Sequence, residues 1–91
     1  MIEVRDNHAA SRFEADVEGQ LAVADYQIVK GTIVFSHTEV PRALQGRGIA
    51  SALIRAALES ARKQGLKLVP ACSFVRRYME THPETQDLLA R

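Results

Sequence analysis

The chain of 91 residues contains few cysteines, aromatic residues and prolines, and it has no marked excess of charge of either sign. Its one cysteine, Cys72, excludes an internal disulfide framework and a metal site built from several cysteines, and it favours a reducing, cytoplasmic compartment. Twelve Lys and Arg residues against eleven Asp and Glu residues give a net charge of +1. This balance provides no bulk attraction to nucleic acid or to an anionic membrane surface, so we expect neither partner.

Long apolar runs are also missing. None approaches the roughly 18 residues that a membrane-spanning helix needs, and residues 1–6 lack the basic flank and apolar stretch of a secretory signal. Hydrophobic residues make up 46% of the chain and charged residues 25%, as is typical of globular proteins. We therefore expect a single small domain over residues 1–91.

The first half of the sequence predicts an antiparallel sheet. Apolar and acidic residues alternate over residues 13–17, and long β-prone runs follow at residues 20–29 and 32–40. The pairs Glu18-Gly19 and Lys30-Gly31 fit hairpin turns between these runs. Residues 2–5 are a candidate fourth strand.

The second half predicts helices around one short strand. Apolar residues recur with helical spacing from Ala50 to Ala61, and Gly65 is suited to follow the end of this helix. Residues 66–72 have the pattern of a short strand, in which Pro70 should lie at a sheet edge or where strand pairing is lost. Ser73 is a candidate cap for a helix over residues 74–81, and Pro83 should begin a last helical turn. The expected fold is of the α/β class, α+β type, with one mixed sheet and two to three helices.

The segment Gln45-Gly46-Arg47-Gly48-Ile49-Ala50 lies between the last predicted hairpin strand and the best predicted helix. Glycines allow close approach of a ligand to the backbone, and a helix start offers unpaired N–H groups to phosphates. Arg47 is able to add a charge-assisted bond. The same two glycines also suit a purely structural turn, so the loop alone leaves both interpretations open.

In its context, however, the loop resembles the Q/R-x-x-G-x-G/A motif of the GNAT superfamily of acyl-CoA N-acyltransferases. The flanking segments His37-Thr38-Glu39-Val40-Pro41 and Cys72-Ser73-Phe74-Val75, with His82-Pro83-Glu84, resemble a subgroup of very small GNAT-like proteins. The resemblance runs from Phe13 to about Leu88. It implies a minimal GNAT-like fold, with a mostly antiparallel sheet in which one strand pair splays apart around acetyl-CoA.

The resemblance also implies roles for individual residues toward the cofactor. The backbone of Val40 would pair with the pantetheine amides, the loop main chain would hold the pyrophosphate, and Phe74 and Tyr78 would flank the cofactor arm. The implied cofactor-binding residues are Val40, Gln45, Gly46, Arg47, Gly48, Ile49, Ala50 and Phe74.

Three residues are candidates for the chemistry. Cys72 would lie beside the acetyl thioester, where it would accept the acetyl group, protonate the departing coenzyme A, or only fill space. Tyr78 matches the helix position of the family's general acid, although the usual Asn-x-x-A-x-x-x-Tyr context is missing. His37 shares a strand face with Glu39, and the two would deprotonate the incoming amine. Alternatively, both are solvated residues on a half-exposed sheet, or His37 is a hydrogen-bonded core histidine. His8 and His82 have no partner pattern, so no metal site is expected.

The acceptor side should be open, because only about eight residues separate the first two predicted strands, too few for a helix pair. This suits an amine on a protein or a pocket completed by a second subunit, in a chain that is a monomer or a weak homodimer. The leading hypothesis is an acetyl-CoA-dependent N-acetyltransferase that acts on an amine the sequence does not name. The alternatives are an acyl-CoA-binding module with little catalysis and an interaction domain with structural glycines.

Overall fold

The computed structural model describes residues 2–90 and has one five-stranded sheet with helices packed on one of its faces. The strands are β1 (Arg5–Asn7), β2 (Arg12–Val17), β3 (Gln20–Val29), β4 (Thr32–Glu39) and β5 (Lys67–Pro70). The α-helices are α1 (Ile49–Lys63) and α2 (Ser73–Glu80), and short 3₁₀ helices lie at His8–Ala10, Arg42–Leu44 and Pro83–Leu88. The predicted α+β class is confirmed.

The strands follow one another in the sheet in chain order. The first four pair antiparallel, and β5 pairs parallel with β4 after the crossover through α1. A bulge interrupts the β3–β4 ladder, because Asp25 pairs with His37 and Tyr26 with Phe35, which leaves Ser36 unopposed. The sheet is therefore mixed and mostly antiparallel, as the sequence predicts.

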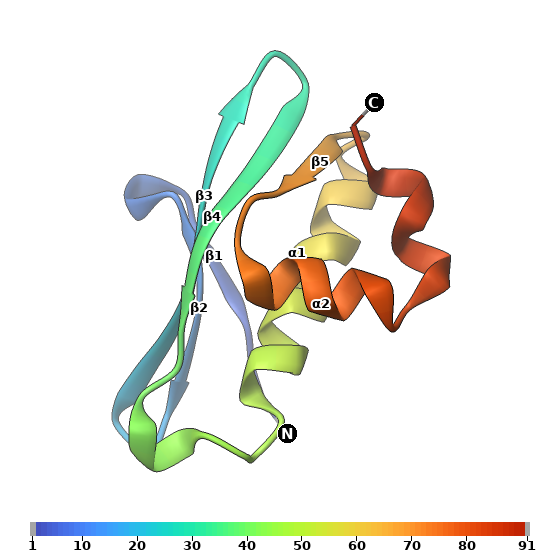
Figure 1. Cartoon of the computed structure of the whole chain (residues 1–91). Helices are drawn as coiled ribbons and strands as arrows, with labels where there is room; N and C mark the ends of the chain where they lie inside the picture. The colour runs from blue at the N-terminus through green and yellow to red at the C-terminus, as the bar shows by residue number, and fades with distance from the viewer. Residues whose placement is uncertain (1, 91) are drawn as a thin grey trace.

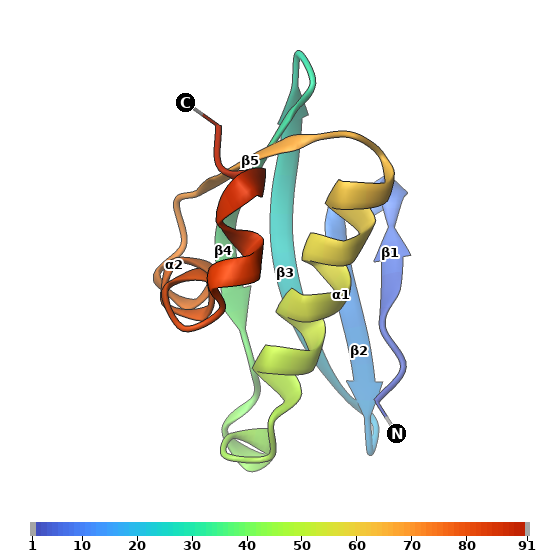
Figure 2. The same ribbon diagram turned by 90° about the vertical axis from the view of Figure 1, so that its right-hand side faces the viewer.

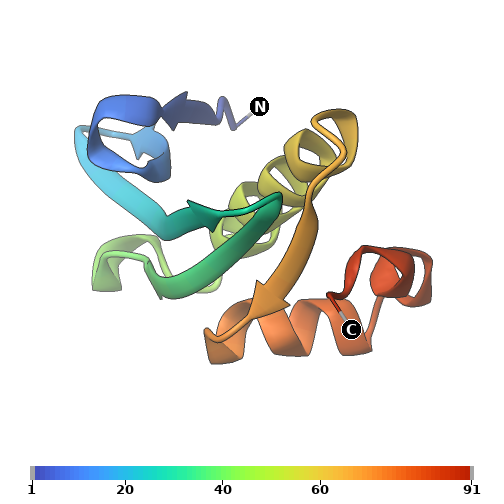
Figure 3. The ribbon, with the colours of Figure 1, turned by 90° about the horizontal axis from the view of Figure 1, so that it is seen from above.

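The core lies between the sheet and the two α-helices. Figure 2 shows α1 crossing β2 and β3, and Figure 3 shows α2 beginning just beyond the end of β5. The apolar stripe of α1 is buried as predicted, with Leu53 and Ala61 fully inaccessible to solvent. It packs against the inward side chains of the strands, such as Phe13 and Phe35, and Val75 and Met79 of α2 complete the core. No helix in residues 2–90 is long and apolar enough to span a membrane.

Several predicted boundaries are wrong by a few residues at the chain's first strand and around β5. The first strand is Arg5–Asn7 rather than residues 2–5, because it pairs through Arg5 with Glu14 and through Asn7 with Arg12. The strand predicted at 66–72 shrinks to β5, since Pro70 ends the pairing. A last helical turn after Pro83 is present, and Leu88 is buried.

The expected capping by Ser73 is also wrong. Ser73 is the first residue of α2, and the extended residue Cys72 takes the cap position with no side-chain cap hydrogen bond. The reason is that the Cys72 N–H donates to the Phe35 carbonyl at 2.9 Å, which fixes Cys72 at the cap position. Its carbonyl then accepts the Arg76 N–H at 3.0 Å, so the helix begins one residue earlier than predicted. Consequently, the sulfur of Cys72 lies at the start of α2.

Candidate functional site

A cavity of about 360 Å³ lies where the loop after β4 enters α1. Its walls come from the end of β4, the glycine loop, the first turn of α1 and one side chain of α2. The lining residues are Val40, Leu44, Gln45, Gly46, Gly48, Ile49, Ala50, Ser51 and Phe74. The cavity thus gathers most of the residues that the resemblance assigns to cofactor binding.

The first turn of α1 presents backbone donors to this cavity. The first bond of the helix runs from the Ala52 N–H to the Gly48 carbonyl at 3.1 Å, so helix geometry gives the N–H groups of residues 48–51 no carbonyl partner. The cap residue Gly48 offers no side-chain cap, and the first turn carries no acidic residue. Free N–H groups and the positive end of a helix dipole are the features that suit the binding of an anion.

Left-handed backbone at two glycines shapes the loop that leads into α1. Gly46 has φ 82° and Gly48 has φ 75°, a region that other residues rarely adopt. A Cβ atom placed on either glycine would meet nothing within 4 Å, so the space beside the backbone is open. The Gln45 side chain ties the loop to the end of β4 by donating from Nε2 to the Val40 carbonyl at 3.2 Å. The loop is therefore held in place with room for a ligand beside it.

The structure places Arg47 outside the lining of the cavity. Its guanidinium donates to a Glu18 carboxylate oxygen at 2.7 Å, across to the turn between β2 and β3. This hydrogen bond lowers the pKa of Glu18. The expected contact between Arg47 and phosphate would require this exposed ion pair to open.

Beyond Phe35, β4 and β5 part as the sequence predicts. The ladder ends at the pair Phe35–Pro70, and the Cys72 N–H donates to the Phe35 carbonyl at 2.9 Å. The Thr38 N–H is directed at the sulfur of Cys72. Because alternate residues of a strand turn their polar groups to the same edge, the Thr38 carbonyl and the Val40 N–H also face the gap. This edge leads from Cys72 to the cavity at Val40.

Cys72 lies at the head of the gap, 7% exposed, as a free thiol. Its Sγ atom lies 3.3 Å from the Thr38 hydroxyl oxygen, and the N–H groups of Val75 and Phe74 also face it. Burial is the largest single influence and favours the neutral thiol, but these donors together lower the pKa of Cys72 below its ordinary value. The sulfur is therefore both sheltered and easier to ionise than an ordinary cysteine.

His37 and Glu39 share one face of β4, as predicted. The His37 Nε2 atom lies 3.2 Å from a Glu39 carboxylate oxygen, and both side chains are exposed, whereas Thr38 between them is buried. The pair therefore lies on the sheet face opposite the helices. Within residues 2–90, no group of three or more His, Cys, Asp or Glu side chains is arranged to hold a metal ion.

Tyr78 lies in a different groove, of about 350 Å³, between α1, α2 and the segment that follows α2. Its ring stacks on His82 with centroids 3.8 Å apart, and burial raises the pKa of its hydroxyl. Tyr78 is not among the residues that line the loop cavity. Its expected role as an acid therefore stays a prediction without a contact to support it.

Thr38 is the site residue that sequence reasoning missed. Its hydroxyl and its N–H both face Cys72, although the two residues lie 34 positions apart. Because alternate residues of a strand lie on opposite faces, the sequence already places Thr38 on the face opposite to His37 and Glu39. This alternation is the signal that could have identified Thr38. Leu44 and Ser51, which also line the cavity, carry no polar pattern that marks them in advance.

The sequence and the fold are similar to those of known proteins. The family model described as GCN5-related N-acetyl-transferase matches residues 12–88. Protein NATD1 of Xenopus tropicalis is 34% identical over 90 residues, which cover 96% of this chain and 83% of that protein. Protein NATD1 of Mus musculus is 36% identical over 90 residues, with 96% and 82% covered.

Among solved structures, the NMR structure of a GCN5-like protein from Staphylococcus aureus superimposes with a TM-score of 0.75. It is 28% identical, and the match covers 97% of this chain and 87% of that one. The matched region includes the glycine loop, the splayed strands and Cys72. The chain therefore belongs to the GCN5-related N-acetyltransferase family.

Proposed function

We propose that the protein is an acetyl-CoA-dependent N-acetyltransferase that transfers an acetyl group to an amine. The observation that carries this proposal is that three features lie next to one another. The uncapped start of α1 borders the loop cavity, the cavity opens onto the free edge of β4, and that edge ends at Cys72. A phosphate site, a strand edge and a sheltered thiol thus follow one another in the order of the parts of acetyl-CoA. We place the protein in the cytoplasm, where a free cysteine stays reduced.

The residues present fit coenzyme A. The N–H groups of residues 48–51, with the loop from Gln45 to Gly48, would hold the pyrophosphate, because they form an anion site without a carboxylate in the first turn of α1. The Thr38 carbonyl and the Val40 N–H would bond the amides of the pantetheine arm. Phe74 supplies an apolar wall to the same cavity.

When bound, acetyl-CoA supplies an acetyl group activated as a thioester. This chain supplies a thiol with a lowered pKa at Cys72, which as a thiolate is a nucleophile and as a thiol is a proton donor. Thr38 fixes the position of the sulfur. On the other sheet face, His37 with Glu39 would take the proton of an incoming ammonium group, since both groups are exposed and hydrogen-bonded to each other.

A second candidate function is an acyl-CoA-binding module with little turnover. The observation that favours it is the connection between β1 and β2, where the structure has only the 3₁₀ helix His8–Ala10 and Ser11. No α-helix of residues 2–90 covers the open face of the sheet, and a hollow on that face, lined by Glu3, Arg5, Glu14, Asp16 and Leu21, has a volume of only about 140 Å³. An acceptor would then be held mainly through contacts made by its own surface, which suits a protein acceptor.

The test is release of coenzyme A from acetyl-CoA in the presence of a panel of amines that includes polyamines, amino acids and lysine-containing peptides. Release that depends on one class of amine supports the transferase. Binding of acetyl-CoA without release for any amine supports the binding module, and absence of binding contradicts both.

The variants Cys72→Ala and Cys72→Ser separate the roles of the sulfur. An acetyl-sized mass increase on the wild type that both variants lack indicates that Cys72 accepts the acetyl group. Full turnover in both variants indicates that the amine attacks the thioester directly.

A further inference from the structure

A second cavity, of about 230 Å³, lies on α2 next to the loop cavity. It is lined by Ser73, Phe74 and Arg77, and it shares Phe74 with the loop cavity. Phe74 thus forms part of the wall of both cavities. A ligand in the loop cavity would therefore lie beside Phe74, and Arg77 lies beyond Phe74 along α2.

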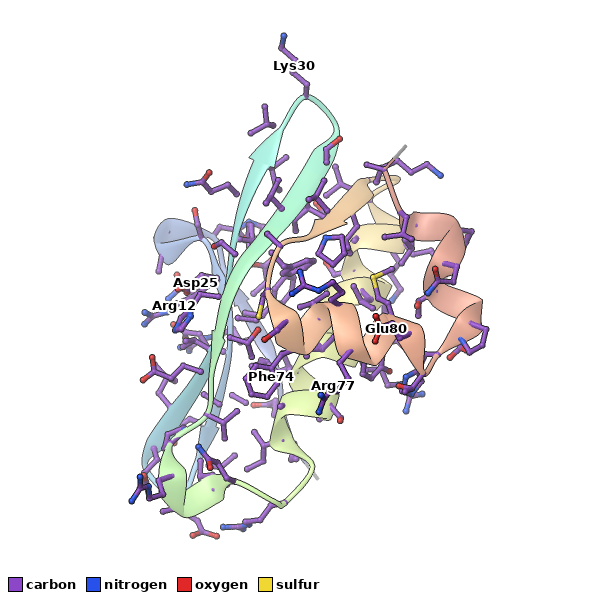
Figure 4. All side chains as sticks on the ribbon, viewed as in Figure 1. Arg12, Asp25, Lys30, Phe74, Arg77 and Glu80 are labelled. Carbon is purple, nitrogen blue, oxygen red and sulfur yellow. The ribbon has the colours of Figure 1, made fainter. Side chains whose placement is uncertain are left out.

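The side chain of Phe74 is exposed to solvent rather than buried. It is 49% exposed, while Val75 and Met79 on the same helix are in the core. Arg77 follows one turn later and therefore lies on the same side of α2 as Phe74. Figure 4 shows both side chains leaving α2 toward the part of the molecule where α1 begins. An exposed ring beside a phosphate site is suited to stack on an aromatic base.

The guanidinium of Arg77 has no hydrogen bond or ion pair among residues 2–90. The neighbouring Arg76 differs, because its guanidinium is directed at the carbonyls of Pro70 and Ala71, at 3.3 and 3.5 Å. The acidic residue of α2, Glu80, lies at the far end of the helix, so no carboxylate precedes Arg77 on α2. Within the described residues 2–90, Arg77 is thus a cation without a partner, and it lies beside an aromatic ring.

Resting on the proposed function, we propose that Phe74 and Arg77 bind the adenosine 3′-phosphate end of coenzyme A, and that Arg77 makes the protein prefer coenzyme A to dephospho-coenzyme A. Coenzyme A carries two separate phosphate sites, the pyrophosphate and the 3′-phosphate, on either side of the ribose. The N–H groups of α1 satisfy the first without a side chain. Phe74 and Arg77 offer the adenine a stacking surface and the 3′-phosphate a charge-assisted partner.

The experiment is calorimetric titration of the wild type, Arg77→Ala and Arg76→Ala with coenzyme A and with dephospho-coenzyme A at low salt. We expect the wild type to bind coenzyme A about five-fold more tightly, which is the effect of an exposed ion pair of about 1 kcal/mol. Arg77→Ala should lower the affinity for coenzyme A to that for dephospho-coenzyme A and leave the latter unchanged. Arg76→Ala removes the same charge one residue away and should keep the preference.

A fourth variant, Phe74→Leu, tests the stacking surface. It should weaken both ligands equally, by about five-fold or more, because both carry the adenine. Thermal melts of each variant show whether the fold is kept.

Equal affinity of the wild type for the two ligands overturns the proposal. So does an equal loss of both affinities in Arg77→Ala, because the guanidinium would then act on the pyrophosphate, which both ligands carry. Unchanged affinities in Phe74→Leu refute the stacking. If the wild type binds neither ligand, the proposed function itself fails.

Discussion

Replacement of Gly48 by glutamate tests the proposed phosphate site directly. Gly48 is the cap residue of α1, with φ 75°, and its missing Cβ leaves open space. Gly48→Glu adds a carboxylate beside the four N–H groups that would bind the pyrophosphate. Gly31→Glu is the matched control, because Gly31 has φ 77°, has equally open surroundings and lies in the β3–β4 hairpin turn.

The two variants should lose similar stability and differ in binding. The left-handed conformation costs a residue with a Cβ roughly 1–2 kcal/mol, and each kcal/mol lowers the melting temperature of a domain of this size by about 4–8 °C. A carboxylate about 6 Å from a phosphate charge, at an effective dielectric constant of about 20, is repelled by roughly 3 kcal/mol. That energy corresponds to a loss of affinity of about 100-fold.

Calorimetric titration with acetyl-CoA and thermal melts of both variants measure the two effects. The new carboxylate in Gly48→Glu lies at the positive end of the α1 dipole, so this variant should be slightly more stable than Gly31→Glu. Loss of binding in the more stable variant then cannot come from unfolding. Undiminished affinity in Gly48→Glu would refute the placement of the pyrophosphate, as would an equal loss in Gly31→Glu.

Three further predictions concern the thiol, a buried charge and the core. Thr38→Val should raise the pKa of Cys72, because the thiolate loses a hydrogen-bond donor; the midpoint of the pH profile of alkylation then moves up, and an unchanged midpoint contradicts this. Hydrogen bonds donated by neighbouring side chains, of which the one from Arg5 has the largest effect, lower the pKa of Glu14 to about 2. Its contribution to stability is therefore full above the unfolded-state pKa of about 4.3 and is lost as the pH falls toward 2, so urea melts of Glu14→Gln should lack much of this pH dependence. Leu53→Ala, at a fully buried position, should lower the free energy of unfolding by about 2–5 kcal/mol, and a change below about 1 kcal/mol in urea melts would contradict this packing.

Most of the fold was predictable because local patterns decide it. The period of two at residues 13–17 and the helical spacing from Ala50 to Ala61 each describe a face that is buried in the structure. Element ends were less predictable because partners far away in the chain set them. The first strand ends at Asn7, whose side-chain amide donates a hydrogen bond to the carboxylate of Glu14. Helix α2 starts at Ser73 because the N–H of Cys72 donates to the Phe35 carbonyl and fixes Cys72 as the cap residue.

The candidate site also has a part that local sequence predicts and a part that depends on contacts with distant residues. Its backbone part, from Gln45 to Ala50, follows from local glycine chemistry and from the resemblance to a family. Its side-chain part depends on contacts across the fold: Arg47 pairs with Glu18 rather than facing the cavity, Tyr78 stacks in another groove, and Thr38 meets Cys72. No spacing within the sequence encodes these three contacts.

The most direct test of the central claim is a titration of the ¹⁵N-labelled protein with acetyl-CoA, followed through its backbone amide resonances. The account predicts the largest shifts at the N–H groups of residues 46–51, with further shifts at Thr38 and Val40 along the free edge of β4 and at Phe74 in α2. Shifts confined to the groove around Tyr78 and His82, or no shifts at millimolar acetyl-CoA, would contradict it.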